Sequence, residues 1–154
     1  MSRRNKGGHG QLFLLFHFAC FRVQTQSAAA GQQTQTLYGI WDNGTALTTS
    51  RNTLVQQQIT AASGTTPSTR SVTRNPVNYL SQRGWYLDLV VGAASATGEK
   101  FIATPRIQSG KILFPTYEPG VGSDCVPGGK NWLYALDPLS GGASFGQVTV
   151  PPGG

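Results

Sequence analysis

Strong turn signals interrupt this chain at short intervals and leave little room for long helices. An Asn-Gly pair stands at 43–44, a Ser-Gly pair at 109–110, and a Pro-to-Gly-Gly stretch at 138–142. The segments between such turns are short and rich in β-branched and aromatic residues, which favour strands. No amphipathic helical pattern of ten residues or more follows residue 35. We therefore predict an all-β fold.

The expected strands are the short segments that these turns bound. They are Thr36–Trp41, Thr53–Thr60, Arg70–Thr73, Trp85–Val90, Lys100–Gln108, Lys111–Tyr117, Asn131–Asp137 and Ser144–Val150. Pro105 indicates an edge or a bulge in the fifth of them, because proline donates no ladder hydrogen bond. The four segments from Trp85 to Asp137 have the count and spacing of one propeller blade.

The run LYALDPLSGG, residues 133–142, predicts a strand that ends in a tight turn. The Asp137 carboxylate can accept backbone N–H groups there, and Pro138 presets its own φ angle. Gly141 or Gly142 supplies the residue with positive φ. We therefore expect Asp137 and Gly141 to be structural turn residues.

The first 35 residues differ in composition from the rest. Four of the twelve basic residues lie in the first 22, an apolar run extends from Leu12 to Phe21, and small residues follow at 27–30. This is the order of a secretory signal, and a spurious start attached to a fragment of a longer gene is the alternative. Both interpretations make 1–35 a disordered or removed segment and assign 36–154 to the β unit. The apolar run is too short for a transmembrane span.

The charge after residue 35 argues against a nucleic-acid partner. Eight basic residues face six acidic ones there, with no basic stripe interleaved with aromatic residues. Both histidines, His9 and His17, lie in the N-terminal segment. Ser-His-Asp and Cys-His catalysis and the usual zinc enzymes therefore lack their histidine in 36–154. We expect no enzyme and no catalytic residue.

The loop from Glu118 to Lys130 is the expected interaction surface. It is long and rich in Gly and Pro, and binding residues are concentrated in such loops. Its candidate residues are Glu118, Asp124, Cys125 and Lys130. Because Cys20 lies in the apolar run, Cys125 would stand alone in a processed chain. It then has either a disulfide partner in a longer polypeptide or a free buried thiol.

Several motifs in a fixed order resemble one family. GWYLDL at 84–89, GEKFIATPRIQSGKILFPTYEP at 98–119 and DCVPGGKNWLYALDPLSGG at 124–142 are similar to the C-terminal propeller of PilC-type tip-associated proteins of type IV pili. LYGIWDNG at 37–44 and NTLVQQ at 52–57 look like further pieces of that region. The resemblance covers about residues 36–145.

The resemblance implies a partial β-propeller with antiparallel, quinoprotein-like blades, within a pilus-tip adhesin or assembly factor that has no catalytic turnover. It implies pilin, other pilus assembly proteins or a host cell surface as partners. The implied location is extracytoplasmic, in the periplasm, on the outer membrane surface or at the pilus tip. Residues 36–154 supply fewer than three blades of about 40–45 residues, so the propeller is incomplete.

The family is also associated with calcium, which it binds in an Asp-rich loop. The six acidic residues of this chain are dispersed, without a D-x-D-x-D run that could surround a calcium ion with oxygens. We therefore expect no calcium site and no cofactor. Two alternative identities stay open: a fragment of a quinoprotein-like dehydrogenase propeller, which the LYALD-type strand suggests, and a small secreted β binding domain.

Overall fold

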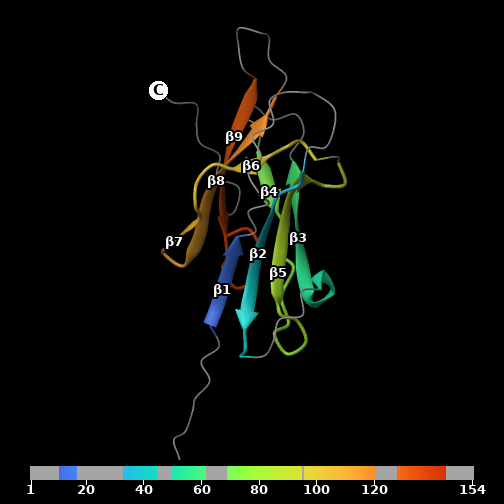
Figure 1. The fold of residues 1–154 in the computed structure, drawn as a ribbon, viewed down its shortest axis with the longest axis vertical. Coiled ribbons are helices and arrows are strands. Elements are labelled where there is room, and N and C mark those ends of the chain that lie inside the picture. Colours follow the sequence, from blue (N-terminus) through green and yellow to red (C-terminus); the bar gives the residue numbers. More distant parts are fainter. Residues whose placement is uncertain are drawn as a thin grey trace, which may run out of the picture.

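The structure is a computed structural model that describes residues 11–16, 33–44, 50–61, 69–94, 96–120 and 128–144. These residues form nine β-strands and one short 3₁₀ helix, η1 (Arg51–Thr53), which confirms the all-β class. The strands form two sheets that lie side by side (Figure 1).

The first sheet has five strands in the order β1-β2-β5-β3-β4. Their bounds are β1 (Gln11–Phe16), β2 (Thr36–Asp42), β3 (Leu54–Ala61), β4 (Arg70–Val72) and β5 (Gly84–Val91). All of its pairings are antiparallel except that of β3 with β5, which is parallel. The pair is parallel because the chain reverses twice between these strands, through β4 and the segment 73–83.

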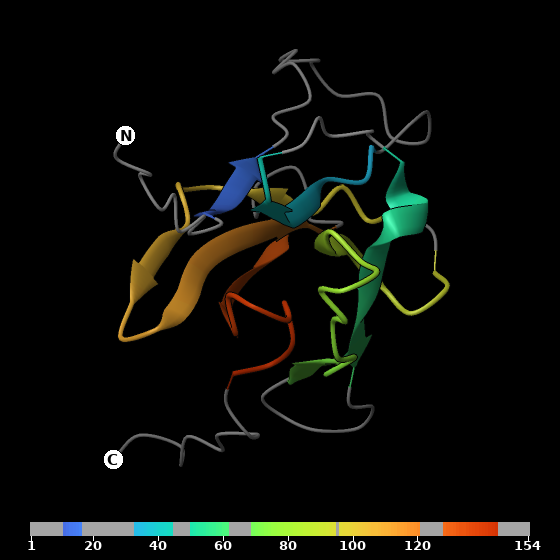
Figure 2. The ribbon, with the colours of Figure 1, turned by 90° about the horizontal axis from the view of Figure 1, so that it is seen from below.

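The second sheet is organised around one long strand. Its members are β6 (Lys100–Phe101), β7 (Arg106–Gln108), β8 (Lys111–Pro119) and β9 (Gly129–Leu136). β9 pairs with β8 from Ile112 to Pro119, so β6 and β7 share the other edge of β8. β8 curves strongly along its length (Figure 2).

Two details of the predicted strands are corrected. The proposed four-strand blade is divided, because both edges of β5 are occupied by β2 and β3 of the first sheet. The expected strand over 100–108 is broken, since the four residues 102–105 face only two residues of β8. Pro105 explains the break: it has no N–H to donate and restricts the residue before it.

Two segments near the ends of the chain can be compared with the N-terminal segment and the last strand that the sequence predicts. The backbone of β1 pairs antiparallel with β2, from Gln11 opposite Asp42 to Phe16 opposite Leu37. The origin and processing of residues 1–35 stay a prediction. Of the expected last strand, only Ser144 belongs to the described residues, just after the bridge that joins Leu136 to Ala143.

The two sheets share one hydrophobic core. The alternation of side chains along β2, β5, β8 and β9 directs one apolar row of each strand into it. The buried members are Leu37, Ile59, Val72, Trp85, Leu87, Leu89, Ile112, Phe114, Tyr134 and Leu136.

Trp85 ties β5 to the turn that follows β9. Its indole Nε1 donates a hydrogen bond of 2.9 Å to the carbonyl of Pro138. A Cβ added at Gly39 would lie 2.3 Å from Trp85 Cε2, and one at Gly141 would lie 2.2 Å from Trp85 Cδ2. Both positions therefore need glycine so that the buried ring can lie against their backbone.

Replacing Gly39 by alanine tests this packing. A methyl group forced against the indole is expected to lower the free energy of unfolding by about 1–3 kcal/mol, the usual cost of overpacking a core. Urea unfolding of Gly39→Ala measures this loss. The same change in a Trp85→Leu background should cost less, because the overlapping ring atoms are absent. An equal loss in both backgrounds would contradict the packing argument.

Candidate functional site

Glu118, a residue of the predicted interaction loop, lies at the end of β8 in an ion cluster between the sheets. Arg70 of β4 donates from Nη1 to Glu99 Oε2 at 2.5 Å and from Nη2 to Glu118 Oε2 at 2.6 Å. The side chains of Arg70, Glu99 and Glu118 are only 7%, 1% and 17% exposed. The guanidinium carbon lies 3.8 Å from the centre of the Trp132 ring, and Trp132 Nε1 donates to Glu118 at 3.0 Å.

Two hydroxyl groups complete this Arg70 cluster around Glu99. Tyr134 accepts from Arg70 at 2.8 Å and donates to Glu99 Oε1 at 3.0 Å, and Thr116 donates to the same oxygen at 2.5 Å. Burial, together with the negative charge of Glu99, raises the pKa of Tyr134 far above its ordinary value. Its phenol therefore stays protonated and remains a donor. Every charge in the Arg70 cluster thus has a partner.

The other residues of the predicted loop have different positions. Lys130 is exposed on β9, directly opposite Glu118 in the register. Asp124 and Cys125 lie outside the described residues. Because the Glu118 carboxylate is held by Arg70 and Trp132, Lys130 is the exposed member of the candidate set among the described residues. Binding by this loop stays a prediction.

Asp137 and Gly141 hold the turn after β9. Asp137 Oδ1 accepts from the backbone N–H groups of Leu139 and Ser140 at 3.0 and 2.8 Å, and from the Ser140 hydroxyl at 3.0 Å. Gly141 has a φ of +70°, and its N–H donates to the carbonyl of Asp137 at 2.8 Å. This geometry places the Pro138 carbonyl where Trp85 reaches it.

The described residues do not fit the calcium site that the resemblance implies. Among them, no three His, Cys, Asp or Glu side chains lie close enough together to hold a metal ion. Glu99 and Glu118 meet at Arg70, whereas Asp137 and Asp42 accept backbone N–H groups in their own turns. Within the same described ranges, no helix has the length and apolar character needed to cross a membrane.

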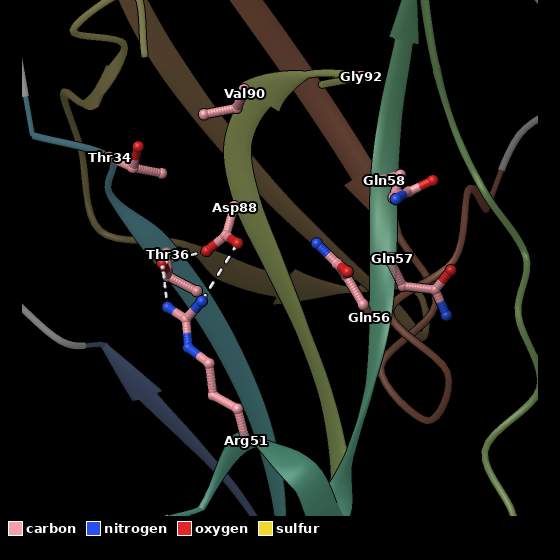
Figure 3. Close-up of a pocket in the computed structure, with 9 residues that line it drawn as sticks. All are labelled: Thr34, Thr36, Arg51, Gln56, Gln57, Gln58, Asp88, Val90 and Gly92. Atoms are coloured by element: carbon pink, nitrogen blue, oxygen red, sulfur yellow. Dashed lines mark hydrogen bonds and ion pairs between the residues drawn. The ribbon is translucent and has the colours of Figure 1, made fainter. Parts of the chain in front are cut away.

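A polar pocket opens on the five-stranded sheet, on the face of β5 opposite its buried row (Figure 3). Its volume is about 300 Å³. The lining residues come from the start of β2 and the segment just before it, from η1, from the middle of β3, and from the second half of β5 and the residue that follows it. They are Thr34, Thr36, Arg51, Gln56, Gln57, Gln58, Asp88, Val90 and Gly92.

The pocket lies where β3 and β5 separate. Gln57 is opposite Leu87, but the next paired residues are Ile59 and Val91, so one residue of β3 faces three of β5. The backbone of Gln58 bonds instead with Thr73, through the Thr73 hydroxyl at 2.9 Å and the Thr73 N–H at 3.0 Å. A β-bulge of this kind re-aims side chains and opens space between neighbouring strands.

One wall of the pocket is a closed triad of Arg51, Thr36 and Asp88 (Figure 3). Arg51 donates to Asp88 Oδ2 at 3.2 Å and to the Thr36 hydroxyl at 3.0 Å, and that hydroxyl donates to Asp88 Oδ1 at 2.5 Å. The Arg51 guanidinium carbon also lies 4.8 Å from the centre of the Tyr86 ring. Ser50 caps η1 by accepting from Asn52 N–H at 3.2 Å, which orients the helix that carries Arg51.

The opposite wall consists of β3 glutamines. Gln57 points away from Asp88 (Figure 3), and its amide donates to the carbonyls of Asn75 and Ser140 at 2.7 Å. Gln56 and Gln58 are exposed, and their side-chain amides form no hydrogen bond with the rest of the described chain. The wall therefore offers uncharged groups that both donate and accept hydrogen bonds.

Comparison with known proteins identifies relatives of this chain. No family model and no solved structure matches it. A type IV pilus biogenesis factor PilY1 homolog of Xylella fastidiosa is 46% identical over 141 residues, which are 91% of this chain and 10% of that protein. The chain is therefore similar to a segment of the PilY1 proteins. The resemblance to PilC-type pilus proteins is thereby confirmed.

A second relative agrees with the first. The type IV pilus biogenesis factor PilY1 of Pseudomonas aeruginosa PAO1 is 34% identical over 147 residues, covering 84% of this chain and 12% of that protein. The chain thus spans about a tenth of the length of these PilY1 relatives. The Xylella match covers 91% of the chain, whereas residues 36–154 make up less than four-fifths of it. The match therefore extends into the first 35 residues.

Sequence reasoning missed every residue of the pocket as a candidate site. The available signal was the Gln-Gln-Gln run at 56–58 within a β-type segment. The run by itself indicates only a strand with a wet face. The parallel pairing with β5 and its interruption, which form the pocket, depend on residues about 30 positions further along.

Replacing Arg70 by leucine tests the Arg70 cluster. The change leaves the buried Glu99 carboxylate without its cation, which is expected to cost about 3–5 kcal/mol in the free energy of unfolding. Urea unfolding measures this cost. Arg106→Leu on exposed β7 is the control and should change stability by less than about 0.5 kcal/mol. Similar small losses in both variants would show that the Arg70 cluster does not hold the sheets together.

Proposed function

We propose that this chain is part of a propeller region in a type IV pilus tip adhesin or assembly factor. The observation that supports this most is the 46% identity to a PilY1 homolog across 91% of the chain. The names of both relatives state a role in the biogenesis of type IV pili. The two-sheet all-β architecture is compatible with a segment of such a propeller. In this proposal the propeller segment formed by this chain acts by binding and has no catalytic turnover.

The proposed location is outside the cytoplasm, in the periplasm, on the outer membrane surface or at the pilus tip. The proposed partners are pilin and other pilus assembly proteins, and a host cell surface for the adhesive role. These assignments rest on the PilY1 names and on the resemblance, since the chain covers only about a tenth of those proteins.

Within this function, the loop between β8 and β9 is the proposed contact with the pilus partner. Its base is firmly held: Gly120 N–H donates to the carbonyl of Gly128 at 3.1 Å, and the Tyr117 hydroxyl donates to the same carbonyl at 3.1 Å. Arg70 fixes Glu118 on one side of this base, and Lys130 is exposed on the other. A fixed base lowers the entropy cost when the loop binds.

Inactivating the gene for this chain in its own bacterium tests the proposed function. Surface pili, counted by electron microscopy, are expected to decrease and to return when the unaltered gene is supplied. The expectation follows from the biogenesis role stated in the names of the relatives. Unchanged piliation in the mutant would contradict the assignment.

Binding of the purified chain to isolated type IV pili tests the loop. The double variant Asp124→Ala, Lys130→Ala removes two charges from the loop. It is expected to weaken binding by at least about tenfold, because charges on the loop and complementary charges on the pilus would fix the docking geometry. Biolayer interferometry measures the affinity. Arg106→Ala, an exposed charge on β7, is the matched control and should bind like the unaltered chain. Equal binding by the loop variant would exclude the loop as the contact.

A further inference from the structure

We infer that the pocket over β3 and β5 binds a neutral, hydroxyl-rich ligand of the saccharide class. The pocket belongs to the five-stranded sheet, whereas the loop at 118–130 belongs to the second sheet. The inference therefore goes beyond the proposed pilus contact and rests on different residues.

The shape and lining of the pocket exclude an apolar ligand. Its volume of about 300 Å³ is at the lower end of ligand-sized pockets. Val90 supplies the large apolar side chain in the lining, and the other side chains there are polar, apart from Gly92. An apolar ligand would bury amides and hydroxyls without hydrogen-bond partners, which is unfavourable.

The charges of the pocket leave no free ion to attract an ionic ligand. Arg51 and Asp88 neutralise each other, and both Asp88 oxygens already accept hydrogen bonds. The three Arg51 nitrogens are also engaged, by Asp88, Thr36 and the hydroxyl of Tyr38. One paired carboxylate is also far from the 6–8 oxygens that calcium takes. The ligand that fits is therefore uncharged.

The groups that remain available match hydroxyls. The amides of Gln56 and Gln58 and the hydroxyl of Thr34 each provide a donor and an acceptor, and none bonds within the described chain. A sugar hydroxyl is likewise donor and acceptor, so neighbouring ring hydroxyls can pair with both atoms of one carboxamide. Gln56 and Gln58 both line the pocket, and because they are two residues apart in β3, strand alternation places their side chains on the same side of it.

The topology disfavours an extended peptide in this pocket. Peptides that bind to sheets typically add a strand at an open edge. β5 lies between β2 and β3, and β3 lies between β5 and β4, so both strands beside the pocket are interior. A peptide would find no free row of backbone groups there, whereas a compact ring needs none.

Nuclear magnetic resonance titration of the ¹⁵N-labelled 154-residue chain tests the inference. The probes are the methyl glycosides of glucose, galactose and mannose, with N-acetylglycine amide, inorganic phosphate and calcium as comparisons. At least one glycoside is expected to shift the side-chain NH₂ signals of Gln56 and Gln58, together with the backbone signal of Gly92. The comparison compounds are expected to leave these signals unchanged.

The double variant Gln56→Ala, Gln58→Ala is expected to weaken glycoside binding by at least about tenfold, since two hydrogen-bonding side chains are removed. These exposed side chains bond to nothing else in the described chain, so the variant should keep its melting temperature. Gln108→Ala, an exposed glutamine of β7, is the matched control and should bind normally. Absence of glycoside shifts, equal binding by the double variant, or stronger shifts with the amide, phosphate or calcium would overturn the inference.

Discussion

The buried guanidinium of Arg70 is the constraint on which the arrangement of the two sheets depends. It must meet Glu99 and Glu118, which are 29 and 48 residues further along the chain. A buried charge that loses its partner costs several kcal/mol, so the first sheet, the strand β8 and the segment before β6 have to be in place together. Tyr134 and Trp132 then fill the remaining positions around the charges.

Trp85 provides a second link, between β5 and the turn after β9, through packing and one hydrogen bond between uncharged groups. Its ring lies where Gly39 and Gly141 leave space, and its N–H reaches the turn that Asp137 builds. With both links in place, β5 presents Asp88 on a fixed backbone to the other members of the triad, Arg51 of η1 and Thr36 of β2. The pocket and the base of the β8–β9 loop are therefore parts of one preorganised scaffold, as binding surfaces require.

Much of the strand content could be predicted because it depends on local pattern. β2, β3, β4, β5, β8 and β9 lie within one or two residues of the segments expected from alternation and turn residues. The assignment of β5 to a blade with its three successors was wrong, because β5 pairs with β2 and β3 instead. The strands that follow β5 in the chain were its expected neighbours because they are close in sequence. The hydrophobic alternation of β5 is compatible with either sheet, so it could not correct this expectation.

The sequence by itself determined the all-β class, the Asp137–Gly141 turn and the relationship to PilY1, because each follows from residues within a few positions or from their order. Only the tertiary structure decided that Glu118 pairs with Arg70 and that a pocket opens between Gln58 and Asp88. Both features join strands that are distant in the chain. Their formation depends on the burial of charge and on a shift in strand register, and neither leaves a local signal in the residues involved.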